Sequence, residues 1–188
     1  MLDGEIGTAF TRLAGCAAPV QLAGMPGIAT VALAAAVADA GGAGMIGAAD
    51  MPPAALEAEL TALAATTGGV FGVNFLMPFL VRDAVPVAAR HARLVEFFYA
   101  APDPALVSAV HEGGALAGWQ VGSREEAIAA AGAGCDYLIA QGVEAGGHVR
   151  GRTPLLPLLA EVLDAVALPV LAAGGIATGR ALAAALAA

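Results

Sequence analysis

Short, almost wholly apolar segments recur along the chain, and alanine-rich segments separate them. They follow one another at intervals of roughly 22 to 30 residues, the repeat of a strand, a crossover helix and a parallel strand. Strands that are apolar throughout need cover on both faces, as in a parallel sheet lined by helices. The pattern therefore predicts an α/β fold with strands at 18–24, 43–48, 70–77, 94–100, 116–122, 135–141 and 169–174.

Capping residues mark the ends of the intervening helices. Thr30 precedes the helical run 31–40, and a threonine side chain at this position can accept a hydrogen bond from the first turn. Ser123, with Glu126 three residues later, has the spacing of a capping box for a helix that ends at Gly132. These signals place helices between the expected strands, without a linker between separate domains.

The charge of the chain argues against nucleic acid as a partner. The net charge is −8, and all eight basic residues are arginine, whereas nucleic-acid binding depends on lysine and arginine neutralising phosphates. The absence of lysine excludes Schiff-base chemistry and the lysine-containing phosphate loop. Cys16 and Cys135 make neither a disulfide framework nor a metal quartet, so we expect no metal site.

Two long segments, 13–38 and 61–81, contain no charged residue. Proline and glycine interrupt both of them, whereas a membrane-spanning helix needs about 20 uninterrupted apolar residues. No basic segment precedes an apolar one at the amino terminus, as a secretory signal would require. We therefore expect no membrane association and a cytoplasmic protein.

The segment QGVEAGGH, residues 141–148, follows the strand expected at 135–141. Loops at the carboxyl ends of parallel strands are where α/β proteins bind ligands. Gly146 and Gly147 let the backbone approach a ligand closely, and histidine, present at His148, is the residue type suited to proton transfer near neutral pH. We predict a functional site here; the alternative is a flexible connection with an incidental histidine.

All four carboxamide side chains lie in or at the end of an expected strand: Gln21, Asn74, Gln120 and Gln141. Solubilising residues would instead scatter over the surface. An open doubly wound sheet and a closed barrel share the same strand and helix rhythm, and amides that meet at one mouth favour the barrel with a ligand of several hydrogen-bonding edges. The alternative is that each amide satisfies a buried backbone group.

Several charged or aromatic residues are open to two interpretations. Glu144 either orients His148 or faces water, and Arg150 and Arg152 either attract an anion or belong to a solvated loop. We expect structural roles for His91, His111, Trp119 and Cys135.

The runs VQLAGMPG, FGVNF, AQGVEAGGH and PVLAAGGIATG, in this order and spacing, resemble the nitronate monooxygenase family, formerly called 2-nitropropane dioxygenases. The resemblance covers essentially the whole chain. It implies an FMN-dependent TIM-type (β/α)8 barrel that oxidises small-molecule alkyl nitronates, and by extension nitroalkanes, with dioxygen to carbonyl compounds and nitrite. Flavin-type enoyl-acyl carrier protein reductases share much of the pattern, so NADH-dependent reduction of an enoyl thioester stays an alternative, as does a non-catalytic barrel fragment.

The resemblance also implies roles for individual residues. His148 matches the catalytic histidine, which takes a proton from a nitroalkane carbon or holds the nitronate near the flavin. Backbone N–H groups of the glycine turn and of the helix that starts near Thr178 would hold the phosphate. With Gln120 added from the carboxamide set, the expected FMN-binding residues are Ala23, Gly24, Met25, Asn74, Gln120, Gln141, Gly146, Gly174 and Gly175.

We expect one FMN-binding barrel domain over residues 1–188, with about seven strand and helix units. A complete barrel typically needs about 250 residues, and family members carry a further strand and a Gly-Thr-Arg loop after the last segment of this chain. We therefore expect an incomplete barrel that lacks the eighth strand and binds FMN weakly on its own. Its unpaired apolar edges would favour self-association, which leaves a homo-oligomer open.

Overall fold

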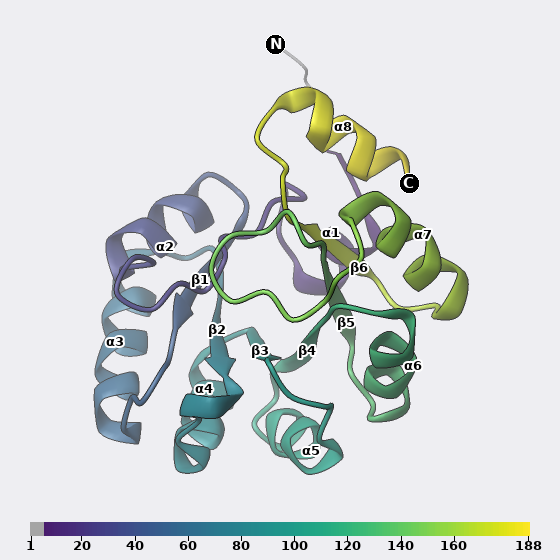
Figure 1. The fold of residues 1–188 in the computed structure, drawn as a ribbon. Coiled ribbons are helices and arrows are strands. Elements are labelled where there is room, and N and C mark those ends of the chain that lie inside the picture. The colour runs from purple at the N-terminus through teal and green to yellow at the C-terminus, as the bar shows by residue number, and fades with distance from the viewer. Residues whose placement is uncertain (1–5) are drawn as a thin grey trace.

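The computed structural model describes residues 6–188, and at its centre a parallel sheet curls around an open interior (Figure 1). The six strands lie side by side in sequence order, and each pairs with its neighbours in parallel. They are β1 (Ala43–Gly47), β2 (Val70–Leu76), β3 (Leu94–Phe98), β4 (Leu116–Val121), β5 (Tyr137–Gln141) and β6 (Val170–Ala173). The fold is an incomplete TIM-type (β/α)8 barrel, as predicted.

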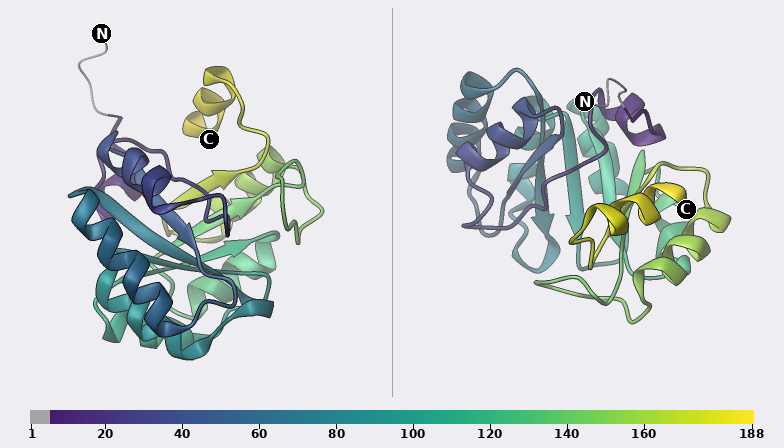
Figure 2. Two further views of the ribbon diagram at one scale, coloured as in Figure 1. Left: turned by 90° about the vertical axis from the view of Figure 1, so that its left-hand side faces the viewer. Right: turned by 90° about the horizontal axis from the view of Figure 1, so that it is seen from above.

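Helices connect successive strands and cover the outer face of the curl (Figure 1). Helix α8 follows β6 and lies at the opposite end of the row of strands from α2 and α3, which flank β1 (Figure 2). The helices are α1 (Ala9–Ala14), α2 (Val31–Asp39), α3 (Pro53–Thr66), α4 (Val85–His91), α5 (Pro104–Glu112), α6 (Arg124–Gly132), α7 (Leu155–Ala165) and α8 (Gly179–Ala187), with short 3-10 turns at Met77–Phe79 and Arg82–Ala84. Residues 1–5 of the expected domain lie outside the described residues, and the single FMN-binding domain stays a prediction.

The strand expected at 18–24 does not form, which corrects the prediction of seven strands. An isolated parallel bridge joins Gln21 to Ala43 at the start of β1. The Leu22 N–H donates to the Ala43 carbonyl oxygen, and the Ala43 N–H donates to the Val20 carbonyl oxygen, both at 2.9 Å. The Val20 N–H donates to the Ala18 carbonyl oxygen at 2.8 Å rather than to the strand, so the segment lies beside β1 without becoming a regular strand.

The capping signals hold with one change. Thr30 Oγ1 accepts the Leu33 N–H at 3.3 Å, and Ser123 Oγ accepts the Glu126 N–H at 3.2 Å. The carboxylate of Glu126, however, accepts the Gly122 N–H at 2.8 Å, one residue before the position that a capping box requires. Half of the predicted capping box is therefore present, and the other half is shifted by one residue.

Alternation along the strands divides the core into two parts. On the outer face, the rings of Phe75, Phe97 and Trp119 stack in sequence beneath the helices, with centroids 5.8 and 5.0 Å apart. On the inner face, Phe10 of α1 packs on Tyr137 of β5 with ring centroids 5.4 Å apart. The inner cluster comprises Phe10, Ala14, Ala43, Met45, Leu94, Tyr137 and Ile139. Helix α1 therefore plugs the interior near the amino-terminal ends of the strands.

Gly44 generates a prediction about the contact between β1 and α2. A Cβ atom at Gly44 would overlap the backbone carbonyl of Ala34 in α2. Because a helix backbone cannot yield as a side chain can, we expect Gly44→Ala to lower the free energy of unfolding by about 1–3 kcal/mol, measured by urea denaturation. Gly132→Ala in α6 is the matched control, since a Cβ atom there meets nothing within 4 Å. Equal losses in both variants would contradict the role of this close approach.

Candidate functional site

A cavity of about 980 Å³ occupies the interior of the curl, and residues at the carboxyl ends of the strands line part of it. The strands, the 19–26 segment, the loop after β5, the turn after β6, and helices α7 and α8 all contribute to its wall. Every residue expected from the sequence to bind the cofactor or to act in catalysis lines this cavity: Ala23, Gly24, Met25, Asn74, Gln120, Gln141, Gly146, His148, Gly174 and Gly175. The predicted convergence on one place is confirmed, while the role of each residue stays a prediction.

Glu96 in β3 also lines the cavity, and the sequence analysis missed it. The side chain is 2% exposed, and Oε1 accepts hydrogen bonds from Gln21 Nε2 at 2.7 Å and from the Tyr137 hydroxyl at 3.0 Å. Oε2 accepts from Asn74 Nδ2 at 3.3 Å. A carboxylate in the middle of the apolar run LVEFF was the signal that could have found it, because charged residues are rarely buried without a partner.

The strand register explains how these distant residues meet. Asn74, Glu96, Gly118 and Tyr137 pair in turn across β2, β3, β4 and β5. A Cβ atom at Gly118 would overlap the Tyr137 ring, so the glycine lets this ring cross β4 and reach Glu96. The result is a row that brings three polar side chains together inside the sheet.

Burial controls the acid–base behaviour of this row. Burial raises the pKa of Glu96, and hydrogen bonds from Gln21, Tyr137 and Asn74 offset part of that effect. Burial and then the neighbouring Glu96 charge raise the pKa of Tyr137 well above its ordinary value. Tyr137 therefore stays protonated, and its hydroxyl group donates a hydrogen bond to Glu96.

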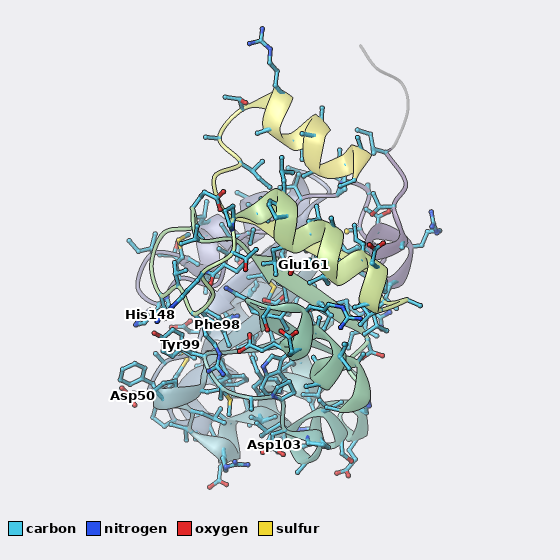
Figure 3. All side chains as sticks on the ribbon, turned by 45° about the vertical axis from the view of Figure 1, so that its right-hand side comes forward. Asp50, Phe98, Tyr99, Asp103, His148 and Glu161 are labelled. Atoms are coloured by element: carbon cyan, nitrogen blue, oxygen red, sulfur yellow. The ribbon has the colours of Figure 1, made fainter. Side chains whose placement is uncertain are left out.

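The glycine-histidine loop, residues 142–148, directly follows β5. Gln141 is 5% exposed, and its Nε2 donates to the backbone carbonyl oxygen of His148 at 3.0 Å. Gly147 has a φ of 72°, a left-handed conformation that favours glycine. The His148 ring is exposed at the mouth and lies edge-on to Tyr99, with centroids 5.7 Å apart (Figure 3). The loop therefore places an accessible imidazole at the entrance to the cavity.

Tyr99 has an unusual backbone conformation. It follows β3 directly, and its φ of 75° is one of two positive values among the non-glycine residues that the structure describes. A left-handed conformation at a non-glycine residue costs of the order of 1–3 kcal/mol and occurs often at functional sites. Phe98 packs against the Tyr99 ring edge-to-face at 5.3 Å, and Tyr99 in turn contacts His148. Strain and packing together hold the tyrosine ring beside the histidine.

The charged residues of the loop agree with the solvated alternative. Both carboxylate oxygens of Glu144 accept the Leu155 N–H, at 3.2 and 3.0 Å, so this side chain caps α7 rather than orienting His148, and the residue remains exposed to water. Pro154, which precedes α7, has no side-chain acceptor, and Glu144 takes that place. Arg150 pairs with Glu126, and Arg152 is exposed; neither lines the cavity.

The turn after β6 is tightly packed. Gly174 has a φ of 121° and Gly175 one of 68°, and a Cβ atom at Gly174 would lie 3.1 Å from both the Ala145 nitrogen and the Gly142 carbonyl oxygen. Thr178 Oγ1 accepts the Ala181 N–H at 3.2 Å and caps α8. The loops after β5 and β6 therefore lie against each other at the mouth, with glycine backbone on the cavity wall.

Two carboxamide oxygens in the wall have no partner within residues 6–188. Oε1 of Gln21 and Oε1 of Gln141 are buried and accept no hydrogen bond. The amide nitrogens do have partners: that of Gln21 donates to Glu96, and that of Gln141 donates to the His148 carbonyl oxygen. Buried acceptors of this kind are costly unless something donates to them. A ligand with N–H or O–H donors would complete both.

The remaining candidates have structural roles, as expected. His111 Nε2 lies 2.9 Å from Asp136 Oδ2, and His91 Nε2 lies 3.5 Å from Glu57 Oε1. Cys135 is buried, and burial raises the pKa of its thiol to about 12. Trp119 is buried, and its indole N–H donates to the Ala100 carbonyl oxygen at 3.2 Å.

Neither a metal centre nor a membrane span is found among the described residues. Within residues 6–188, no three His, Cys, Asp or Glu side chains are grouped so as to hold a metal ion. No helix in the same range has both the length and the apolar character needed to cross a membrane.

The raised pKa of Glu96 predicts how stability changes with pH. The folded protein keeps a proton on Glu96 that the unfolded chain releases at a lower pH, so stability is lost as the pH rises from the unfolded toward the folded pKa. We expect Glu96→Gln to gain stability relative to the parent over this interval, by up to about 1.4 kcal/mol per pH unit. Urea denaturation of both proteins from pH 4 to 8 measures the difference. A difference that is the same at every pH would show that Glu96 has an ordinary pKa.

The family model of nitronate monooxygenase matches residues 8–83 and 81–188. The chain is 39% identical to (3aS,4S,5R,7aS)-5-hydroxy-7a-methyl-1-oxo-octahydro-1H-indene-4-carboxyl-CoA dehydrogenase of Mycobacterium tuberculosis, over 95% of this chain and 51% of that protein. It is 31% identical to a probable nitronate monooxygenase of Staphylococcus saprophyticus, over 97% of this chain and 64% of that protein.

Solved structures show the same architecture. FabK from Thermotoga maritima superposes with a TM-score of 0.90 at 36% identity, over 97% of this chain and 58% of FabK. Nitroalkane oxidase from Streptomyces ansochromogenes superposes with a TM-score of 0.85 at 32% identity, over 96% of this chain and 64% of the oxidase. The chain spans about half the length of the first curated relatives that it matches.

Proposed function

The chain belongs to the nitronate monooxygenase family, and from that premise we propose that its cavity binds FMN and serves a flavin-dependent oxidoreductase that oxidises alkyl nitronates with dioxygen. One observation carries the proposal. Glycine turns, carboxamides and an accessible histidine, drawn from five separate segments, line a single cavity at the carboxyl ends of parallel strands.

The residues present fit a flavin mononucleotide. The unpartnered oxygens of Gln21 and Gln141 suit a ligand with N–H and O–H donors, which the flavin ring and its ribityl chain carry. Gly174 and Gly175 leave the backbone open toward the cavity, as a phosphate requires in a chain without lysine. The proposed FMN-binding residues are Ala23, Gly24, Met25, Asn74, Gln120, Gln141, Gly146, Gly174 and Gly175.

His148 is the proposed catalytic residue. When bound, FMN supplies the electron-accepting chemistry of the oxidation. His148 takes the proton from the carbon next to the nitro group: the C–H bond breaks, the proton moves to an imidazole nitrogen, and the electron pair stays on the substrate as a nitronate. The imidazolium formed in this way then attracts the anion, a role that Arg150 does not fill because it pairs with Glu126.

Two neighbours position the histidine. Gln141 fixes the backbone of His148 through its carbonyl oxygen, and the Tyr99 ring limits where the imidazole can turn. Both contacts leave the ring nitrogens of His148 free of any hydrogen bond within the part of the chain that the structure describes. The imidazole is therefore oriented but still open to a substrate.

Dehydrogenation or reduction at a thioester substrate is the second candidate. Two relatives, at 39% and 38% identity, are named as dehydrogenases of a carboxyl-CoA compound. The same scaffold could also carry the NADH-dependent reduction of an enoyl thioester. Consumption of NADH with a crotonyl thioester, and no oxygen uptake with a nitronate, would favour this candidate over nitronate oxidation.

The test begins with the absorbance spectrum of the purified full-length protein, which shows flavin bands if the cavity holds FMN. Oxygen uptake with an alkyl nitronate, together with nitrite release, then identifies the reaction. A protein without flavin bands that also fails to bind added FMN would overturn the cofactor proposal. A flavoprotein that does not consume oxygen with nitronates would overturn the substrate proposal alone.

Replacement of His148 separates proton removal from the later oxidation. We expect His148→Ala in the full-length protein to lower turnover of neutral nitroalkanes by about 10²- to 10⁴-fold, the usual effect of losing a general base. Preformed nitronates, which have already lost the proton, should be affected less. His91→Ala is the control, because His91 lies on α4 beside Glu57 and outside the cavity. Equal turnover of a neutral nitroalkane by parent and His148→Ala would remove His148 from the mechanism.

A further inference from the structure

Glu96 is buried among neutral hydrogen-bond donors. Its three partners are the amides of Gln21 and Asn74 and the hydroxyl of Tyr137, and no arginine or histidine within residues 6–188 forms an ion pair with it. A buried carboxylate without a cation is costly to keep ionised. Protonation by one proton from solvent is the alternative that the surroundings allow.

The two carboxylate oxygens differ in their surroundings. Oε1 accepts two short hydrogen bonds, from Gln21 and Tyr137, whereas Oε2 accepts one longer bond from Asn74 Nδ2 at 3.3 Å. A proton on Glu96 therefore belongs on Oε2, the oxygen with fewer donors. An O–H at that position would face the amino group of Asn74, and two donors cannot bond to each other.

A turn of the Asn74 amide relieves this conflict. The backbone at Gly24 presses against Asn74, since a Cβ atom at Gly24 would overlap the Asn74 side chain. The side chain is thus held in place, and rotation about its last bond is the movement left. After a half-turn the carbonyl oxygen of Asn74 accepts from Glu96, and the amino group takes the opposite position.

We propose that Glu96 is a positioning residue whose protonation decides which atom of the Asn74 amide faces the cavity. A neutral Glu96 turns the Asn74 amino group toward the cavity and offers a ligand a donor. An ionised Glu96 holds that amino group and leaves the carbonyl oxygen as an acceptor. The link to cofactor binding rests on the proposed function, in which Asn74 contacts FMN.

The groups around Glu96 make this a local equilibrium. Gln21 from the 19–26 segment, Asn74 from β2 and Gly118 from β4 do not titrate. Tyr137 from β5 is the titratable neighbour, and its pKa, raised well above the ordinary value, keeps it protonated through the neutral range. The raised pKa of Glu96 moves its titration toward neutral pH.

Asn74 is the only asparagine in the chain, which makes the proposal directly measurable. Protein labelled with ¹⁵N only in asparagine side chains gives one amide NH₂ pair in an NMR spectrum. We expect this pair to shift with pH in the ligand-free protein, with one midpoint above the ordinary glutamate pKa of about 4.3. A pair that does not move over the range where the protein stays folded would overturn the proposal.

Two variants test the assignment to Glu96. Glu96→Gln offers a permanent N–H in place of the carboxyl proton, so its Asn74 pair should stay at the low-pH position of the parent at every pH. Glu161→Gln is the matched control, because Glu161 is exposed on α7 (Figure 3). The Asn74 pair of this variant should shift with pH as it does in the parent. A Glu96→Gln protein whose Asn74 pair still titrates as in the parent would overturn the proposal.

Tyr137→Phe gives a test that does not need Glu96→Gln to fold. This variant keeps the carboxyl group of Glu96 but removes the Tyr137 hydroxyl, a donor to Oε1. That hydrogen bond stabilises the ionised form and lowers the pKa of Glu96, so its loss raises the pKa. The midpoint of the Asn74 shift should therefore rise. An unchanged or lower midpoint would overturn the proposal.

Added FMN separates this inference from the proposed function. The pH titration of Asn74 is read without ligand, so it holds or fails whatever the protein binds. A further shift of the same NH₂ pair on addition of FMN supports contact between Asn74 and the cofactor. Its absence under conditions where FMN is bound overturns that contact and leaves the titration result in force.

Discussion

One row of the parallel register supplies Asn74 and Glu96 to the cavity wall, together with the groups behind them. Asn74, Glu96, Gly118 and Tyr137 face one another across four strands, and a shift of one residue in any strand would turn its member to the outer face. The row works because Gly118 has no side chain, so the phenol can cross a strand to the carboxylate. On the outer face, the stacked rings of Phe75, Phe97 and Trp119 occupy the next position along β2, β3 and β4. Packing of these rings on the outer face therefore keeps the polar row on the inner face.

The sequence predicted the elements that depend on local pattern. Continuous apolar runs located the six strands within a few residues, and the common edge of parallel strands explains why four carboxamides from separate runs line one cavity. The strand expected at 18–24 was assigned wrongly, because apolar composition does not show that the Val20 N–H turns back to the Ala18 carbonyl oxygen. Residue type alone did not show that Glu144 is fixed on the Leu155 N–H, which depends on how the loop after β5 folds back to α7.

Glu96 could not be interpreted from sequence for a different reason. Its partners lie 75, 22 and 41 residues away, and only the register brings them together. A lone carboxylate in an apolar strand indicates that something compensates it, but not whether the partner is a cation, a neutral donor or a proton. In the structure the partners are neutral donors. Because no cation holds Glu96 in its ionised form, its protonation depends on pH.

The floor and the mouth of the cavity have opposite physical character. The floor is buried and hydrogen-bonded, whereas the mouth consists of glycine loops, a strained tyrosine and an exposed histidine. A buried, hydrogen-bonded floor suits a ligand that is always the same, as a cofactor is, and loops at the mouth are where related barrels vary their substrates. Relatives named for a carboxyl-CoA compound and for nitronates share this one scaffold. Because the loops at the mouth and the buried Glu96 row come from different segments of the chain, the loops can vary while the row is kept.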